Sequence, residues 1–133
     1  MNGGLFLDSS VLVALIAKES DWPELSERLE QAERRFTSAV AMLEAVIVLS
    51  SRMSVEPGQA EGALGKFLSA HEVGILPIDA AVGRRAVRAF EDYGKGRHSA
   101  RLNLGDCISY GCAREAGLTL FYKGDDFAKT DLA

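Results

Sequence analysis

Two segments near the end of the chain decide its fold class: Leu102-Asn-Leu-Gly-Asp106-Cys-Ile-Ser-Tyr110 and Leu118-Thr-Leu-Phe-Tyr-Lys-Gly-Asp125-Asp126-Phe127. The first places an acid at the entrance of an apolar helix that Gly117 ends, the usual C-terminal glycine. The second is a buried strand with acids directly behind it. Ligands of open α/β sheets bind just outside the carboxyl ends of the strands. These acids are therefore expected at a ligand site.

The rest of the chain repeats this alternation of short apolar strands and amphipathic helices. Strands are predicted at 5–7, 35–38, 73–78 and 118–122, and helices at 9–18, 39–53, 57–71 and 104–116, with further helices beginning at Trp22 and after Asp79. The helix 39–53 is so apolar that it is expected to be largely buried, and the last residues are expected to be loose. The predicted fold class is α/β, a short parallel β-sheet flanked by α-helices on both faces, as one domain over residues 1–133.

Composition indicates an ordinary soluble protein: of 133 residues, 47% are hydrophobic and 26% are charged. The apolar N-terminal run lacks a basic segment and is interrupted by Asp8, so neither a signal peptide nor a membrane span is expected. A cytoplasmic location without a membrane partner is the default prediction. Cys107 and Cys112 would lie about 140° apart on one helix, and no histidine has a ligand at zinc spacing, which argues against a disulfide or a zinc site.

The formal net charge of −4 does not by itself indicate nucleic-acid binding. The segment 84–101, however, holds six basic residues against two acidic ones. A local basic flank beside acids is compatible with a phosphate backbone approaching a bound metal. A solvated helix face followed by a polar loop explains the same pattern, so both interpretations stay open here.

Four acids from distant parts of the chain lie in apolar surroundings. Asp8, Asp106 and Asp125 could each serve as a helix cap or a turn residue. Glu44 is harder to explain, because it lies within an apolar helix and no basic residue occurs within four positions of it. A buried carboxylate without a partner is costly. Oxygen ligands without histidine or cysteine favour Mg²⁺, or Mn²⁺ instead, and such an ion commonly acts on phosphate groups.

The motifs resemble those of PIN-domain ribonucleases, and more narrowly of the VapC-type toxins of bacterial toxin–antitoxin pairs. The matching pieces occur in the same order over nearly the whole chain: Phe6-Leu-Asp8-Ser-Ser10-Val, Leu43-Glu44-Ala45, Asn103-Leu-Gly-Asp106-Cys, and Leu120-Phe-Tyr-Lys-Gly-Asp125-Asp126-Phe. Each motif is weak alone, whereas the four together are specific.

The resemblance implies roles for individual residues. Asp8 and Asp106 match the principal Mg²⁺ ligands, Glu44 completes the pocket, and Ser10 matches the polar residue that accompanies the first acid. Asp125 fits the fourth acid best, with Asp126 as the alternative.

The resemblance further implies an endoribonuclease that hydrolyses RNA with a metal-activated water. It also implies a homodimer and a cognate VapB-type antitoxin that covers or enters the acidic groove. Arg97 and Arg101 are expected to guide the RNA backbone.

Three other functions are compatible with parts of the pattern. A small Mg²⁺-dependent phosphatase would need a second aspartate two positions after Asp8, where this chain has Ser10. A phospho-receiver could use Asp79, but the acidic pair usual after its first strand is missing. A degenerate PIN-like module that only binds proteins remains the other alternative, although such sites usually lose one of the acids.

Overall fold

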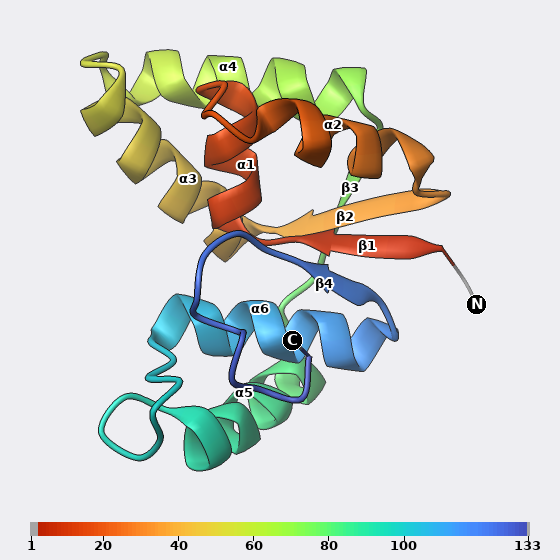
Figure 1. The fold of residues 1–133 in the computed structure, drawn as a ribbon, viewed down its shortest axis with the longest axis vertical. Helices are drawn as coiled ribbons and strands as arrows, with labels where there is room; N and C mark the ends of the chain where they lie inside the picture. Colours follow the sequence, from red (N-terminus) through yellow and green to blue (C-terminus); the bar gives the residue numbers. More distant parts are fainter. Residues whose placement is uncertain (1–2, 133) are drawn as a thin grey trace.

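A computed structural model describes residues 3–132 and contains a four-stranded sheet with helices on both faces (Figure 1). All paired strands are parallel, in the order β3-β2-β1-β4. The strands are β1 (Gly4–Leu7), β2 (Arg34–Ser38), β3 (Val73–Leu76) and β4 (Thr119–Phe121). The helices are α1 (Ser9–Ile16), α2 (Trp22–Gln31), α3 (Ala39–Arg52), α4 (Pro57–Ala70), α5 (Ala80–Tyr93) and α6 (Leu104–Ala116). The predicted α/β class is confirmed; the two ends of the predicted range 1–133 lie outside the described residues.

The helices form two layers, α1–α4 on one face of the sheet and α5 and α6 on the other (Figure 1). Successive side chains of a strand point to opposite faces. Accordingly, Leu5 and Leu7 pack into the α1–α4 core, while Phe6 between them packs into the α5–α6 core. The central strand β1 is therefore buried on both faces, as its uninterrupted apolar sequence indicates.

The order of the strands creates a crevice at the carboxyl end of β1. The chain leaves β1 toward β2 on one side and returns to pair β4 on the other, so the direction of winding reverses between β1 and β4. Ligands of open α/β sheets bind at such a switch point. The backbone N–H of Asp8 donates to the carbonyl of Phe121 over 3.0 Å, which holds the ends of these two strands together.

The prediction that the third helix is largely buried was wrong. Leu43 is 60% exposed and Ile47 is 59% exposed, and the buried stripe of α3 consists of Ala41, Ala45 and Leu49. This stripe packs on α1 and α4, and the opposite face has no neighbour within the described chain that covers it. The apolar composition of α3 led to an overestimate of its burial, because composition does not determine how many elements pack around a helix.

The prediction of a loose C-terminal segment was also wrong. Phe127 is fully buried against the α5–α6 core, and the hydroxyl of Thr130 donates to its carbonyl over 2.8 Å. Tyr110 donates to Asp131 over 2.7 Å, and Arg114 pairs with the same carboxylate. One aromatic side chain and two contacts to α6 thus anchor a segment whose composition is polar.

Candidate active site

Asp8 and Ser10 lie at the carboxyl end of β1 and form the first part of the site. Asp8 is the N-cap of α1, and its Oδ2 accepts hydrogen bonds from the backbone N–H of Ser10 over 3.1 Å and from the Ser10 hydroxyl over 2.6 Å. The same Ser10 oxygen accepts the backbone N–H of Lys123 over 3.0 Å. Ser10 therefore links the first acid to the loop that follows β4. Asp8 therefore has the capping role that its sequence position allowed, and it is only 4% exposed.

Asp106 is held by a capping box at the start of α6. Asn103 is the N-cap, and its Oδ1 accepts the backbone N–H of Asp106 over 2.8 Å. In return, Oδ2 of Asp106 accepts the backbone N–H of Asn103 over 3.1 Å. This reciprocal pair satisfies two N–H groups that the helix itself leaves free. Asp106 thus caps the helix from its third position, while Asn103 is the N-cap proper.

Glu44 reaches the same place from α3 because residue 105 is a glycine. An ideal Cβ built on Gly105 would lie 1.8 Å from Oε2 and 2.4 Å from Cδ of Glu44. The carboxylate of Glu44 thus occupies the space that a side chain at position 105 would fill. Position 105 directly precedes Asp106 in the sequence. Any other residue at position 105 would displace this carboxylate.

The fourth acid of the cluster is Asp126, where sequence spacing favoured Asp125. The negative charge of Asp126 is among the causes that raise the pKa of both Glu44 and Asp106, which places Asp126 with these acids. The turn begins at Gly124, whose φ is +99°, and the carbonyl of Asp125 accepts the backbone N–H of Ala128 over 3.1 Å. Asp125 thus contributes its backbone to the turn.

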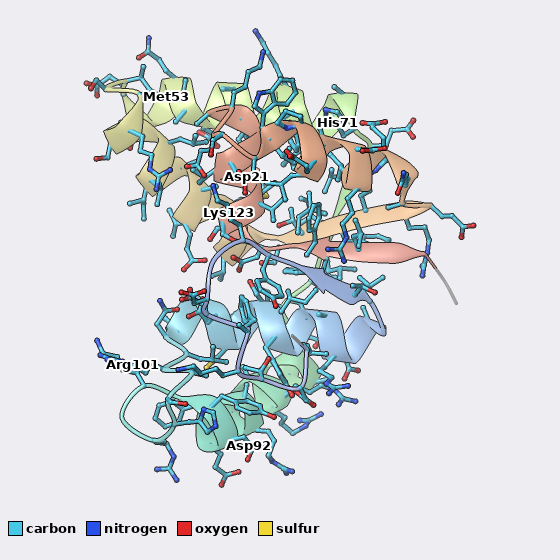
Figure 2. The ribbon with its side chains drawn as sticks, in the orientation of Figure 1. Asp21, Met53, His71, Asp92, Arg101 and Lys123 are labelled. Atoms are coloured by element: carbon cyan, nitrogen blue, oxygen red, sulfur yellow. The ribbon has the colours of Figure 1, made fainter. Side chains whose placement is uncertain are left out.

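Lys123 anchors the turn that carries these two acids. Its Nζ donates to Glu19 over 2.5 Å and to Asp21, which lies beside it in Figure 2, over 3.0 Å. Its backbone N–H donates to the hydroxyl of Ser10. The side chain therefore ties the loop after β4 to the connection between α1 and α2. In Figure 2, Lys123 lies above and Arg101 below the N-terminal end of α6.

Burial and mutual repulsion disfavour the charged forms of the central acids. The pKa of Asp106 is raised from 3.8 to about 7, and burial is the largest cause. The hydrogen bond with Asn103 opposes this rise, while the charges of Asp126, Asp8 and Glu44 contribute to it. The pKa of Glu44 is also raised, first by burial and then by the charge of Asp8, and a hydrogen bond with Ser9 partly offsets both. The site therefore stabilises any cation that enters it.

The structure offers these acids no counter-charge of their own. Within residues 3–132, no lysine or arginine forms an ion pair with Asp8, Glu44, Asp106 or Asp126. As the side chains stand, no three acids, histidines or cysteines of this described part are arranged to ligate one ion together. Asp8 and Asp106 instead turn toward N–H groups at the starts of their own helices. The donor set is nevertheless one of oxygens only, which suits a hard divalent cation.

Of the two arginines predicted to guide RNA, the structure brings one to the acids. Arg101 lines a cavity of about 360 Å³ together with Asp125 and Asp126. Arg97 instead donates to the carbonyl of Glu91 over 3.3 Å and lies over the ring of Phe90, 5.7 Å from its centroid. Arg97 is thus engaged by the end of α5, and its predicted part in the site is not supported.

Sequence reasoning missed two residues that shape the site, Asn103 and Gly105. Asn103 could have been recognised as an N-cap with an acid three positions later. Gly105 carries a weaker signal, since glycine inside a helix costs about 1 kcal/mol relative to alanine and therefore needs a reason. That reason is the carboxylate of Glu44, which comes from a helix some sixty positions earlier in the chain.

The fold and the site together define a class of protein: a parallel α/β protein whose carboxylates gather at the switch point of its sheet. Comparisons with known proteins identify the family. The family model described as "PIN domain" matches residues 5–132. A VapC ribonuclease of Rhizobium meliloti (strain 1021) is 37% identical over 139 residues, covering 96% of this chain and 98% of the relative. Ribonuclease VapC30 of Mycobacterium tuberculosis is 38% identical over 129 residues, covering 97% and 96% respectively.

The chain belongs to the PIN domain family. Solved structures agree in fold. VapC20 of Mycobacterium tuberculosis, a sarcin-ricin loop cleaving toxin, matches with a TM-score of 0.72 at 17% identity, covering 93% of this chain and 92% of that one. A chain from a toxin–antitoxin complex of Klebsiella pneumoniae matches with a TM-score of 0.71 at 20% identity, covering 96% and 93%.

Proposed function

We propose that this protein is a metal-dependent endoribonuclease that acts as the toxin of a toxin–antitoxin pair. The observation that carries the proposal is the convergence of four carboxylates from four separate elements, none of which forms an ion pair with a lysine or arginine of the described residues. The relatives named VapC ribonucleases support the reaction, because they match over nearly the full length of the chain. The whole chain, residues 1–133, would serve as one PIN domain.

A divalent cation, Mg²⁺ or alternatively Mn²⁺, would be held by Asp8, Glu44, Asp106 and Asp126. When bound, such an ion activates water and stabilises negative charge on a phosphodiester. The chain's own residues prepare the site for it. Ser10 and Asn103 fix the orientations of Asp8 and Asp106, and Gly105 leaves room for the carboxylate of Glu44.

The proposed substrate is RNA, and the proposed partners are a VapB-type antitoxin and a second copy of this chain. Leu43 and Ile47 on α3 and Leu104 on α6, which is 81% exposed, offer apolar surface next to the acids for such contacts. No helix of residues 3–132 has the length and hydropathy needed to span a bilayer. We place the activity in the cytoplasm, where the RNA substrate occurs.

The phosphatase and phospho-receiver alternatives gain no support from the structure. A receiver of the flavodoxin-like type has the strand order 2-1-3-4-5, whereas the order here is β3-β2-β1-β4. The candidate acceptor, Asp79, is the N-cap of α5, where its Oδ1 accepts the backbone N–H of Val82 over 3.0 Å. Asp79 is thus a capping residue remote from the acid cluster.

The direct test is cleavage of a cellular RNA pool by the purified protein, with Mg²⁺, with Mn²⁺ and with EDTA. We expect discrete fragments with either metal and none with the chelator, because without a cation the carboxylates would repel the phosphodiester and its developing negative charge would not be stabilised. Glu44→Gln is expected to abolish the same fragments. Fragments that persist in EDTA would contradict the proposed metal dependence. Absence of cleavage, in the presence of metal and of an RNA that binds, would favour a non-catalytic binding module.

The two adjacent acids after β4 are expected to differ in their contribution to cleavage. Asp126→Asn removes a charge that acts on both Glu44 and Asp106, so we expect RNA cleavage to fall by about 10- to 100-fold, with a higher Mg²⁺ concentration needed for half-maximal rate. Asp125→Asn is the matched control, with the same change one residue earlier, and should retain most activity. Equal losses in the two variants, measured as kcat/KM over an Mg²⁺ titration, would refute the assignment of Asp126.

A further inference from the structure

Most basic side chains of this protein already have a partner within the chain. Those that form an ion pair, a side-chain hydrogen bond or a contact with an aromatic ring are Lys18, Arg28, Arg34, Arg35, Arg52, Arg85, Arg88, Arg97, Arg114 and Lys123. Within residues 3–132, the basic side chains without such a partner are Lys66, Arg84, Lys95, Arg101 and Lys129. All five are exposed. Their distribution over the surface is uneven.

Three of these unpartnered cations, Lys95, Arg101 and Lys129, line the same cavity of about 360 Å³. They come from two segments far apart in sequence, the loop after α5 and the turn after β4. The other two, Lys66 on α4 and Arg84 on α5, do not line this cavity. The cavity therefore gathers most of the positive charge that the fold leaves uncompensated.

The loop that carries Lys95 and Arg101 is held in shape by backbone hydrogen bonds. The N–H of Lys95 donates to the carbonyl of Leu102 over 3.0 Å, and Leu102 in turn donates to Tyr93 over 2.9 Å. Arg101 lies between the buried residues Ala100 and Leu102 and has a φ of +57°, a region that residues with a Cβ rarely adopt. The closed loop thus imposes an unfavourable backbone on Arg101 and directs its side chain to the cavity.

The cavity directly adjoins the acid cluster. Asp125 and Asp126 also line it, as does Asn103, which orients Asp106. Despite this proximity, none of the three cations forms an ion pair with either acid. A ligand with one negative group at the metal and a second one beside it would pair with these cations, while the acids bind the metal. A phosphodiester strand has this character, because a second phosphate follows the one that is cleaved.

We propose that Lys95, Arg101 and Lys129 form a binding subsite for the RNA phosphate next to the scissile one. The inference rests on the proposed function and adds the residues that position its substrate. Arg101 can donate two parallel hydrogen bonds to phosphate oxygens, while Lys95 and Lys129 bind as point charges. The three residues act in binding and take no part in the bond cleavage.

The test measures the salt dependence of RNA binding, because each lost phosphate contact lowers the slope of log K against log salt by about 0.7 for a single strand. The probe is a short, unstructured, fluorescein-labelled RNA read by anisotropy, with Asp106→Asn present in every protein to prevent cleavage. We expect Lys95→Ala/Lys129→Ala to lower the steepness of this slope by up to about 0.7, the value for the loss of one phosphate contact. The control Lys66→Ala/Arg84→Ala removes the same charge elsewhere and should leave the slope unchanged.

Arg101→Gly is a second variant, chosen because it should change RNA binding without destabilising the fold. Glycine accepts a positive φ without strain, so this substitution should not lower the melting temperature. We expect it to lower the steepness of the slope by up to about 0.7, because Arg101 contacts the same phosphate. In the protein with native Asp106, the same substitution should raise KM for RNA cleavage with little change in kcat.

The possible failures are distinguishable. The subsite would be refuted if Lys95→Ala/Lys129→Ala and Lys66→Ala/Arg84→Ala gave equal slopes. If both slopes were lowered equally, diffuse electrostatic attraction would explain binding. If neither slope changed, these cations would not contribute to binding. If the native chain cleaves RNA while the slopes stay equal, only the subsite fails. If the slopes change as expected but the native chain with Mg²⁺ cuts no RNA, the proposed hydrolysis fails and the cavity remains an RNA-binding site.

Discussion

Replacing Asp106 by asparagine is expected to lower RNA cleavage by at least about 100-fold in the presence of Mg²⁺. The substitution removes one negative charge from the centre of the acid cluster and keeps the shape of the side chain. The Oδ1 of asparagine can still accept the backbone N–H of Asn103, so the capping box and the start of α6 should be retained. The loss should therefore appear in kcat/KM without loss of fold.

The same substitution is expected to stabilise the metal-free protein at neutral pH. The pKa of Asp106 is about 7 in the folded chain, whereas its ordinary value is 3.8, so the folded state binds more protons between these values. The free energy of unfolding therefore falls as pH rises from about 4 to about 7. Asp106→Asn removes this loss, and at pH 8 we expect the variant to be more stable than the native protein by about 1 to 4 kcal/mol.

Urea denaturation between pH 4 and pH 8 in EDTA measures this effect. The stability difference between Asp106→Asn and the native protein should be small at pH 4 and should grow toward pH 8. Saturating Mg²⁺ should restore stability to the native protein and much less to the variant, since binding to the folded state alone stabilises it. A difference that does not depend on pH would show that Asp106 is not the group that resists ionisation.

Replacing Gly105 by alanine is expected to impair cleavage by about 10- to 100-fold without touching a charged residue. The added Cβ would lie 1.8 Å from Oε2 of Glu44, so the flexible end of that side chain must leave its place beside Asp106. Stability should stay the same or rise by up to about 1 kcal/mol, because alanine favours a helix more than glycine does. The variant thus tests whether cleavage depends on where the Glu44 carboxylate lies, because the carboxylate itself is retained.

Gly65→Ala is the matched control for this prediction. Gly65 also lies within a helix, and no atom of the rest of the protein lies within 4 Å of an added Cβ there. Its melting temperature should rise without any change in cleavage. Combining Gly105→Ala with Glu44→Ala should cost no more activity than Glu44→Ala alone, because both remove the same carboxylate from the site. Additive losses would mean that Gly105 acts through something other than Glu44.

Sequence reasoning was most successful where a residue's role depends on its near neighbours. The strand before Asp8 and the helix between Leu104 and Gly117 follow from local patterns of apolar residues and from local capping chemistry. The two strands predicted at 73–78 and 118–122 are real but shorter, ending at Leu76 and Phe121. Pro77 cannot donate to a neighbouring strand, which explains the first of these ends.

The choice between Asp125 and Asp126 could not be made from spacing, because it depends on the direction in which a turn presents each side chain. Gly124 with its positive φ begins this turn, and the buried ring of Phe127 anchors its end. The same limit applies to Arg97 and Arg101, of which the first lies over the ring of Phe90 and the second lines the cavity beside Asp126. A one-dimensional pattern carries no information on such directions.

The sequence by itself determined the fold class, the order of the elements and the set of acids, because periodicity and capping act over a few residues. The tertiary structure decided which of those acids meet, that Gly105 makes room for Glu44, and that Lys95 and Lys129 join Arg101 at one cavity. These arrangements depend on strand order and on how α3 and α6 approach each other across the sheet edge. Such contacts join residues far apart in the chain, and packing, not local propensity, selects them.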